Sequence, residues 1–486
     1  MSVSADPDLK RPGLVLALLA FAQFISAIDY NIVYVALPDI GRALGFTTQS
    51  LQWVVSAYAV ALGGLLLLGG RAADLLGPRR MFALALWLYG LASLAGGLAT
   101  SPGILVAARA VQGIGGALLL PATLSLINTG FAEGPQRNRA LAIWGGAGGV
   151  GLASGSLLGG VLTNSLGWQA VFYVNVPLAL GAALAAARVL PADPARGRER
   201  TFDIPGTLTA TAAITLLVFG LVNGPETGWA SIRGAGALAG GALLLGVFVL
   251  IERRTSDPLV PLRLLANRSL LTAMAVIFVF MGTFGTQYYL FTTYLQNVRD
   301  YTALATGLAF VPPALIAMAG TKTSAMLLNR YGTRTTMTSG LTLGAIGMAT
   351  LATGMSPQGS YPALLPGLAL LSLGQGIAWT ALFASAASGV ADHEQGIASA
   401  LASTTQQIGS AVGLAALVAV ANAGLHDDRP PAAQAVVGGL QAAGWTAAAA
   451  ALAGAVLALT LKQPRPKPAP VPRNPRHQDP AEVPNP

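Results

Sequence analysis

The stretch PGLVLALLAFAQFISAIDYNIVYVALP, residues 12–38, is apolar over more than the roughly 20 residues that a helix needs to cross a bilayer. It contains one carboxylate, Asp29, and no lysine or arginine. An unpaired carboxylate at the centre of a membrane costs roughly 2.5–3.5 kcal/mol on the insertion scale. Thirteen further apolar stretches follow, and one of them carries a deep arginine, Arg109. Charges kept at that cost indicate a working role and favour a transporter driven by proton movement.

The composition excludes a soluble protein. Hydrophobic residues make up 53% of the chain and charged residues only 10%, and the mean hydropathy is +0.62. The 59 glycines fit transmembrane helices that pack closely through small residues. The chain has no cysteine, which excludes disulfides, thiol chemistry and cysteine-metal sites. The sequence therefore predicts an integral membrane protein.

Several classes of chemistry lack the residues that they need. All three histidines, His393, His426 and His477, fall in predicted loops or in the tail, so carboxylates must carry any proton coupling. The segment GTKTS around Lys322 lacks the spacing of a phosphate-binding loop, and no other nucleotide motif is present. The net charge of +9 is spread over short loops, which argues against nucleic acid as a partner. We expect no cofactor and no metal.

Apolar runs bounded by turn and charge signals predict fourteen membrane-spanning helices. Their approximate ranges are 13–38, 49–69, 81–99, 103–128, 139–163, 168–188, 204–223, 233–252, 269–296, 304–328, 336–354, 361–387, 395–423 and 436–461. The first run is too long for a removable signal peptide and lacks a cleavage site, so we expect it to remain as a helix.

Charge asymmetry predicts the orientation. Most of the 28 lysines and arginines fall in the loops of one side if both termini are cytoplasmic, as the positive-inside rule requires of a multi-pass protein of the cell membrane. Residues 462–486 are rich in proline and basic residues and are expected to be disordered. This tail serves either orientation and solubility or contact with anionic lipid or a partner.

An internal repeat divides the chain. The loop GRAADLLGPRR after the second helix is echoed by LLNRYGTRTT after the tenth, and VQGIGGALLL is echoed by LGQGIAWTAL. The matched loop positions, each 255 residues apart, are Asp74 with Asn329, Gly77 with Gly332, and Arg79 with Arg334. Transporters built from two such halves rock one half against the other around a midplane site. We therefore predict an all-α membrane fold with two pseudo-symmetric six-helix bundles, residues 1–190 and 266–461, and two extra central helices in residues 191–265.

These motifs resemble the major facilitator superfamily, and the fourteen helices are similar to its drug:proton antiporter branch, over nearly the whole chain. IDYNIVYVALP resembles the first-helix signature of that branch, and LVAARAVQGIGGA matches the family's proton-relay pattern. Pro78 and Leu75 depart from the family's loop signature. The matching residues are Gly70, Asp74, Gly77, Arg79 and Arg80 in the loop, and Arg109, Gln112, Gly113 and Gly115 in the fourth helix.

The antiporter signature of the fifth helix is present in part. Its glycines Gly151, Gly155, Gly159 and Gly160 are in place, whereas Ser156 stands where the family has proline. The resemblance implies a monomeric secondary transporter that exports drugs or amphipathic, lipophilic or cationic small molecules in exchange for protons by alternating access. The glycines would let this helix slide against a neighbour, or they serve static packing.

Asp29 and Arg109 are expected at matching depths, about 13 Å and about 10 Å from the same end of their helices. We expect both to face a central cavity, where deprotonated Asp29 binds a drug and protonated Asp29 releases it. The alternative is a pair that only joins two helices. Asp74, Arg79 and Arg80 are expected to hold the inward-closed state through a helix N-terminus or a neighbouring acid, or to act only as a topology signal.

Two further predictions concern the interior. Lys322 either extends its chain to the membrane surface or serves the cavity. A pocket for flat amphipathic compounds is predicted from aromatic and amide side chains, each of which is otherwise explained by packing or by anchoring at the membrane interface. These side chains are Tyr30, Tyr34, Trp53, Tyr58, Gln287, Tyr288, Tyr289, Trp379 and Gln406.

Two other function classes fit the sequence less well than proton-coupled export. An uncoupled or symporting facilitator of a nutrient or metabolite would need a cavity richer in hydrogen-bonding groups and would not need Asp29. A membrane enzyme would need a nucleophile or a His/Asp constellation within the membrane, and the sequence has none. The sequence therefore predicts a transporter and not an enzyme.

Overall fold

The computed structural model describes residues 11–47, 50–132, 135–193, 203–228, 230–255, 262–387, 395–423 and 433–461, and all regular secondary structure in these ranges is helical. Its elements are α1 (Pro12–Leu44), η1 (Ser50–Gln52), α2 (Trp53–Leu76), α3 (Pro78–Gly97), α4 (Pro102–Gly130), α5 (Pro135–Leu166), α6 (Ala170–Tyr173), α7 (Asn175–Val189), α8 (Ile204–Thr227), η2 (Ile232–Gly236), α9 (Ala237–Glu252), α10 (Leu262–Leu265), α11 (Arg268–Phe284), α12 (Gln287–Thr293), η3 (Tyr294–Val298), α13 (Ala303–Ala309), α14 (Val311–Gly354), α15 (Tyr361–Ala387), α16 (Gln395–Asn422) and α17 (Ala433–Ala458). The predicted tail and the three histidines lie outside the described residues.

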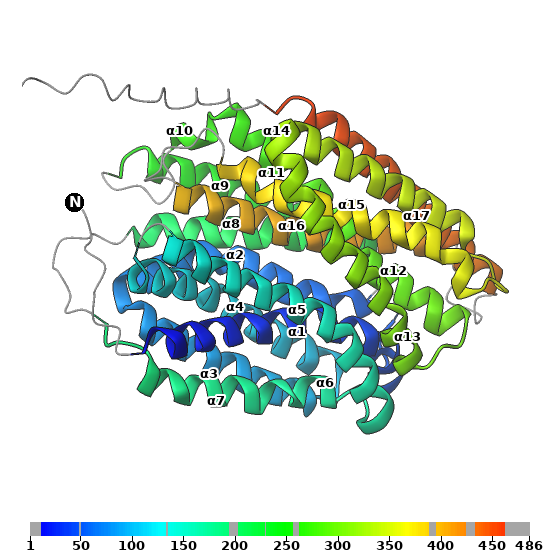
Figure 1. The fold of residues 1–486 in the computed structure, drawn as a ribbon, viewed down its shortest axis with the longest axis horizontal. Coiled ribbons are helices and arrows are strands. Elements are labelled where there is room, and N and C mark those ends of the chain that lie inside the picture. The colour runs from blue at the N-terminus through cyan, green and yellow to red at the C-terminus, as the bar shows by residue number, and fades with distance from the viewer. Residues whose placement is uncertain are drawn as a thin grey trace, which may run out of the picture.

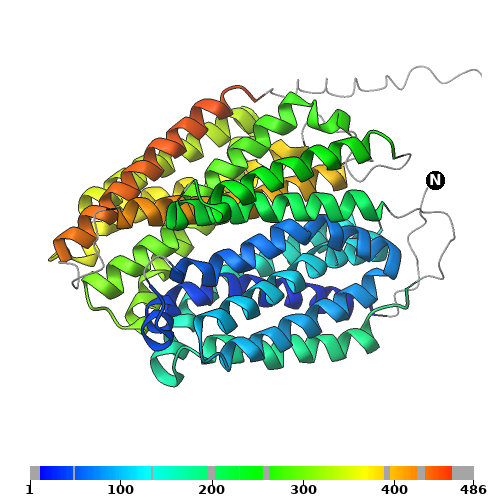
Figure 2. The same cartoon turned by 180° about the vertical axis from the view of Figure 1, so that it is seen from behind.

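The helices form two groups that lie side by side. Helices α1–α7 occupy one side of the molecule and α11–α17 the other, with α8 and α9 along the seam between them (Figures 1 and 2). The chain enters α1 and leaves α17 on the same face, here called the terminal face, and the face at the other ends of these helices is called the opposite face.

Local sequence signals set several helix ends. Pro12, Pro78 and Pro102 occupy the first turns of α1, α3 and α4, where the missing N–H has no helical partner to lose. Gly45 ends α1 in the left-handed conformation, with φ of 71°. Membrane helices tolerate interior proline because neighbouring helices satisfy the freed backbone groups, which accounts for Pro38 within α1.

The two loops that the internal repeat matches have the same unusual backbone. Gly77, between α2 and α3, has a φ of 98°, and Gly332, 255 residues later, has a φ of 78°. Side chains other than glycine rarely adopt this conformation. Gly332 also lies at a kink within α14, which joins the predicted helices 304–328 and 336–354 into one nearly continuous element. The matched glycines therefore make equivalent turns in the two groups of helices.

The two extra helices pack onto the core. Trp53 of α2 lies against Phe219 of α8 with ring centroids 5.7 Å apart, and Gly64 of α2 allows Thr215 of α8 to approach closely. Val218 of α8 belongs to the same buried cluster as Ala411 of α16. Helix α8 thus covers the seam where α2 and α16, one from each group, meet.

The two groups touch near the opposite face. A Cβ added at Gly160 of α5 would lie 2.5 Å from the carbonyl oxygen of Ala303, and one added at Gly307 would lie 2.7 Å from that of Ser156. Toward the terminal face, a Cβ added at Gly145 of α5 meets no atom within 4 Å. Helix α5 therefore contacts the other group near the opposite face, whereas the face of α5 that carries Gly145 is open.

Eleven helices in the described residues are long and apolar enough to cross a membrane, and two shorter apolar helices, Ser50–Leu66 and Pro205–Leu221, accompany them. Each of the fourteen predicted ranges falls mainly on helical residues. Residues 336–354, however, are not among the helices that are apolar enough to cross a membrane. The integral membrane fold agrees with this finding, whereas the count of fourteen stays a prediction. One predicted range, 168–188, is divided between α6 and α7.

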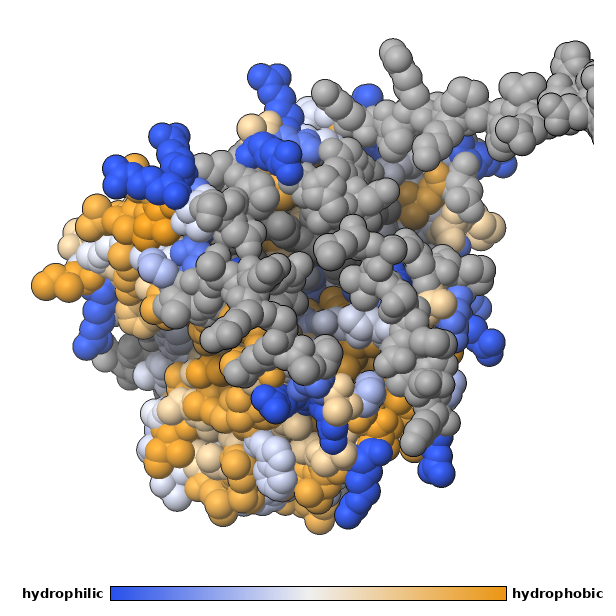
Figure 3. Space-filling model, turned by 90° about the vertical axis from the view of Figure 1, so that its left-hand side faces the viewer, coloured by the Kyte–Doolittle hydropathy of each residue, from blue (hydrophilic) through white to orange (hydrophobic). Residues whose placement is uncertain are grey.

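Charge is distributed around the terminal face. Figure 3 looks onto this face and shows hydrophilic side chains around its rim with hydrophobic ones between them. Exposed arginines here include Arg80, Arg268, Arg330 and Arg334. Their positions are compatible with a cytoplasmic terminal face under the positive-inside rule.

Widening the contact at Gly160 tests whether the opposite face is closed by small residues. Because the chain has no cysteine, Val35→Cys, at a site that is 0% exposed near this contact, introduces a unique thiol. Adding Gly160→Val should speed its labelling by an impermeant thiol reagent about 5- to 30-fold, the effect of 1–2 kcal/mol of strain. Gly149→Val, which meets no atom within 4 Å on the same helix, is the control. Equal labelling in all three proteins would contradict the closed arrangement.

Candidate functional site

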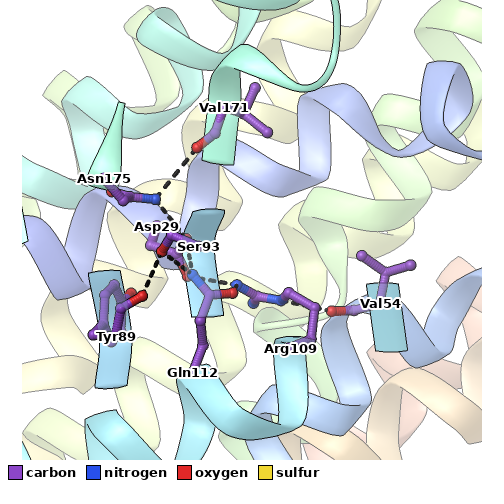
Figure 4. Close-up of polar contacts among 8 residues, drawn as sticks. All are labelled: Asp29, Val54, Tyr89, Ser93, Arg109, Gln112, Val171 and Asn175. Carbon is purple, nitrogen blue, oxygen red and sulfur yellow. Dashed lines mark hydrogen bonds and ion pairs between the residues drawn. The ribbon is translucent and has the colours of Figure 1, made fainter. Parts of the chain in front are cut away.

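Asp29 and Arg109 form a direct ion pair inside the group α1–α7. Asp29 comes from the middle of α1 and Arg109 from the first half of α4. The guanidinium Nη1 lies 2.6 Å from Asp29 Oδ2 (Figure 4). Their exposed fractions are 0% and 1%. The depth match expected from the sequence is therefore realised as a contact.

Amide side chains complete the shell around the carboxylate. Asn175, at the start of α7, donates from Nδ2 to Asp29 Oδ1 at 2.8 Å, and Gln112 Nε2 lies 3.3 Å from the same oxygen. Gln112 Nε2 also donates to Ser93 Oγ at 2.7 Å, and Ser93 donates to the carbonyl of Tyr89 (Figure 4). Every group that faces the Asp29 oxygens in these bonds is an N–H donor, so the network suits the ionised carboxylate.

The arginine has partners of its own. Its Nε donates to the carbonyl of Val54 at 2.8 Å, Nη1 donates to Gln112 Oε1 at 3.0 Å, and the guanidinium lies 4.5 Å from the ring centre of Tyr58. A buried ion pair is stable only when further hydrogen bonds satisfy both partners, as they do here. Breaking it from one side would leave an unpaired charge in the membrane.

We expected this pair to face an open central cavity, and the structure shows that it does not. Both side chains are enclosed by α1–α4 and α7, and Tyr58 and Gln112 fill the space beside them. The reason is that amide and aromatic side chains from the neighbouring helices satisfy the charges directly, so water or a ligand is not required.

Sequence reasoning missed two members of this network. These are Asn175 and Ser93, which lack the charge that makes Asp29 and Arg109 conspicuous in an apolar run. Asn175 is 0% exposed, and an amide buried at the end of an apolar run is the signal that could have identified it. Its Oδ1 has no hydrogen-bond partner among the described residues.

The glycines of the fourth-helix motif allow close helix contacts. A Cβ added at Gly113 would lie 2.4 Å from the Tyr58 carbonyl of α2, and one at Gly115 would lie 3.0 Å from the Ala85 carbonyl of α3. The backbone of α4 can therefore approach both neighbours, which holds Arg109 and Gln112 beside α1.

In the fifth-helix motif the glycines divide between two neighbours. Cβ atoms added at Gly151, Gly155 and Gly159 would lie 2.6–2.7 Å from carbonyl oxygens of α1. Gly160 instead contacts α13, as described above, and the backbone of Ser156 contacts Gly307. Packing accounts for three of these glycines, while Gly160 lies between the two groups of helices.

The loop motif on the terminal face is organised by an acid from elsewhere in the chain. Asp193, just beyond α7, accepts hydrogen bonds from the backbone N–H groups of Arg79 at 2.9 Å and Arg80 at 3.2 Å. Arg80 Nε lies 3.9 Å from the same carboxylate, and the Arg79 side chain donates to the carbonyl of Ala187. Asp193 therefore caps the N-terminus of α3, favoured by its unpaired N–H groups and dipole.

This arrangement joins α3 to α7 within one group of helices. The expected contact to a neighbouring acid exists, but it does not cross to the other group. The side chain of Asp74 lies outside the part of the chain that the structure describes, so its predicted role stays a prediction. Gly70 meets only an ordinary contact at 3.8 Å, whereas its neighbour Gly69 would clash with the Ala117 carbonyl at 2.0 Å, so Gly69 is the position that allows α2 to approach α4.

The predicted pocket residues are spread over several environments. Tyr30, Tyr34 and Tyr288 form an aromatic row that crosses from α1 to α12, with ring centroids 6.2 Å and 5.8 Å apart. Tyr30 also shares a 2.9 Å hydrogen bond with Ser410 of α16. Phe310 continues the row, stacked on Tyr288 at 5.3 Å.

The remaining members of that set have other neighbours. Gln287 donates to Gln375 at 2.8 Å, and Trp379 lies 6.1 Å from Phe280. Trp53 packs on α8, and the ring of Tyr58 lies beside the Arg109 guanidinium. The other two members are half-buried Gln406 on α16 and buried Tyr289 on α12.

Lys322 lies on α14 with an exposed side chain, a position open to both interpretations of its role. Among the described residues, His, Asp and Glu form no group of three that could hold a metal ion.

Comparisons with known proteins give the same family as the motifs. The model of the Major Facilitator Superfamily matches residues 19–414. The chain is 41% identical to the puromycin resistance protein pur8 of Streptomyces alboniger over 85% of this chain and 82% of that protein. It is also 41% identical to the cephamycin export protein CmcT of Amycolatopsis lactamdurans, over 84% of this chain and 85% of that one.

A solved structure shares the fold. The human organic anion transporter MFSD10 aligns with a TM-score of 0.61, over 93% of this chain and all of that one, at 18% sequence identity. At this identity the likeness concerns the arrangement of helices alone.

A charge-pair test separates the buried network from ordinary surface pairs. Asp29→Asn and Arg109→Gln should each lower the apparent melting temperature strongly, because breaking a buried pair costs about 3–5 kcal/mol. The double variant Asp29→Leu with Arg109→Met should recover part of that loss. The exposed pair Asp39–Arg42 supplies the control, since its removal should cost at most about 1 kcal/mol. A double variant whose loss equals the sum of the single losses would contradict the coupling.

Removing the Asp193 cap tests the loop assignment. Asp193→Ala should speed hydrogen exchange at the amides of Arg79 and Arg80, because loss of a cap costs about 0.5–2 kcal/mol. Asp193→Asn keeps an acceptor oxygen and should change exchange much less. The start of α4, where Ser101 makes no side-chain cap, serves as an internal reference. Unchanged exchange in Asp193→Ala would rule out capping.

Proposed function

Because the chain belongs to the Major Facilitator Superfamily, we propose that it is a secondary transporter that exports drug-like small molecules in exchange for protons by alternating access. Two relatives that are 41% identical over most of both chains are named for puromycin resistance and cephamycin export, which supports drug efflux. The family is one of transporters and not of enzymes.

The enclosed Asp29–Arg109 pair is the observation that supports proton coupling. A proton on Asp29 would neutralise the carboxylate and turn one of its oxygens into an O–H donor. The N–H groups of Arg109 and Asn175 are donors themselves and cannot accept a hydrogen bond from it. Protonation therefore forces the network to rearrange. Because these groups belong to α1, α4 and α7, the rearrangement acts on the packing of those helices.

Helix α1 connects this network to the contact between the two groups of helices. Tyr30 directly follows Asp29 in the chain and bonds to Ser410 of α16, and Gln296 of η3 donates to the carbonyl of Val35 at 2.9 Å. A shift of α1 after protonation would change these contacts near the opposite face. In exchange of drug for protons the proton binds from the outer side and leaves to the inner side. Proton binding would therefore favour closure of the two groups at the opposite face, the outer one in this proposal, and proton release would favour their separation there.

The proposed mechanism departs from direct competition between drug and proton for Asp29. The carboxylate is 0% exposed and its partners are in place, so a drug reaches it only after the network opens. We assign drug contact to the aromatic row of Tyr30, Tyr34 and Tyr288, whose π-faces suit flat lipophilic or cationic compounds. The proton acts through helix movement.

In this proposal the terminal face is cytoplasmic, the chain has fourteen membrane spans, and a single chain is the transport unit. The contacts at Gly160 and Gly307 then correspond to an inward-facing state that is closed outside. Proton entry releases about 2.3 kcal/mol per 100 mV and about 1.4 kcal/mol per pH unit, enough for export against a substantial gradient.

Efflux of a fluorescent lipophilic cation from vesicles tests coupling. Vesicles with the parent chain should extrude the dye when a pH gradient is imposed, and Asp29→Asn should lose the gradient-dependent part by at least about tenfold. Asp39→Asn, which changes a partly exposed carboxylate on the same helix outside the Asp29 network, should retain it. Folded protein is confirmed for each by size-exclusion profile.

The outcomes distinguish the proposal from a facilitator. Transport by the parent chain that ignores the gradient would favour uncoupled movement and contradict antiport. Gradient-dependent efflux that persists in Asp29→Asn would move coupling to another group.

A further inference from the structure

A polar cleft lies on the opposite face where the two groups of helices meet. It has a volume of about 390 Å³ and is bordered by the ends of α1 and α5 on one side and by η3 and the turn into α13 on the other. Its polar lining includes Asp39, Thr163, Asn164, Gln296, Asn297 and Asp300. A volume above about 300 Å³ is in the range of small-molecule sites.

The charge in this cleft is unbalanced. The guanidinium of Arg42 forms an ion pair with Asp39 of the same helix, which compensates that carboxylate. Asp300 has no ion-pair partner among the described residues. The adjacent Arg299 donates to the carbonyl of Pro357 at 2.6 Å. Arg299 keeps its positive charge but does not line the cleft. The residues that do line it carry two carboxylates and one guanidinium, a net charge of one negative unit.

A buried hydroxyl in the lining lacks a partner. Thr163 is 7% exposed, and its Oγ1 has no hydrogen-bond partner within the part of the chain that the structure describes. An unmet buried hydroxyl costs about 1–3 kcal/mol, a cost that a ligand would remove. Gln296 is held by its amide N–H bond to Val35, which leaves its carbonyl oxygen as an acceptor.

We propose that this cleft binds a small protonated amine that also carries hydroxyl groups, as an amino sugar does. The ammonium would pair with Asp300, and the hydroxyls would bond to Thr163 and to the amides of Asn164, Gln296 and Asn297. An anion is disfavoured by the net charge, and an apolar drug by the polar lining.

Occupancy of this site is linked to the conformation of the chain. Thr163 belongs to α5 and Asp300 to the turn before α13, so the site is complete only while the two groups are in contact at this face. A ligand that binds one conformation better shifts the population toward it. The amine would therefore hold the opposite face closed. Asp29 and Arg109 do not line the cleft, so this inference does not rest on the proposed transport activity.

Binding is measured on the purified full chain with glucosamine at pH 6, where its amine is protonated. We expect it to raise the apparent melting temperature and to slow thiol labelling of Val35→Cys, while N-acetylglucosamine, which lacks the charge, has at least fivefold weaker effects. Asp300→Asn should remove the difference between the two sugars. Asn is suited to the left-handed backbone at this position, where φ is 55°.

Thr163→Val tests the hydroxyl independently, should Asp300→Asn fold poorly. It should weaken glucosamine binding about threefold or more, the effect of one hydrogen bond. Thr353→Val is the matched control, because that hydroxyl bonds only within its own helix, to the carbonyls of Ala349 and Thr350. Equal effects of glucosamine and N-acetylglucosamine on the parent chain, or no effect of either up to about 100 mM, would overturn the proposal.

Discussion

The rest of the structure depends on the need to satisfy two charges within an apolar environment. Asp29 and Arg109 cannot lie unpaired among lipid-embedded helices, so the helices that carry them must stay at one depth and one rotation. Asn175 and Gln112 extend this requirement to α7 and fix the orientation of the carboxylate. A single proton on Asp29 would upset all of these contacts together. Proton transfer can thereby act on several helices although the acidic group is small.

Close packing through small residues decides which helices move together. Lipid tails give helices no hydrophobic reason to associate, so contact depends on how near their backbones can come. Gly151, Gly155 and Gly159 place α5 directly on the carbonyls of α1, so these two helices pack closely along much of their length. The contact of Gly160 with α13 is confined to one end of α5. The molecule thus combines an extensive contact within one group of helices and a limited contact between the groups.

Much of the fold was predictable because membrane helices leave direct traces in sequence. Apolar length predicted the helical ranges, and helix rise predicted matching depths for Asp29 and Arg109. Their ion pair was only the alternative to the expected central cavity. The sequence repeat pairs Gly77 with Gly332, and both glycines have a positive φ in the structure. Asn175 was missed because hydropathy averages conceal one amide at a helix start, and Asp193 because its partner loop lies more than 100 residues away. Of the residues expected to line a pocket, Tyr30, Tyr34 and Tyr288 share an aromatic row, while Trp53 and Tyr58 have other neighbours. The pocket itself stays a prediction.

The sequence by itself determined that this chain is a helical membrane protein with one carboxylate in its first helix and one arginine in its fourth, at matching depths. Lipid forces every backbone polar group into internal hydrogen bonds and makes each intramembrane charge conspicuous. Only the tertiary structure decided that the pair is enclosed, that α8 covers the seam between α2 and α16, and that the two groups meet near the opposite face. An apolar helix face transfers from water equally well into lipid or against another helix. Hydropathy therefore predicts that a face is buried, and three-dimensional packing decides against which neighbour.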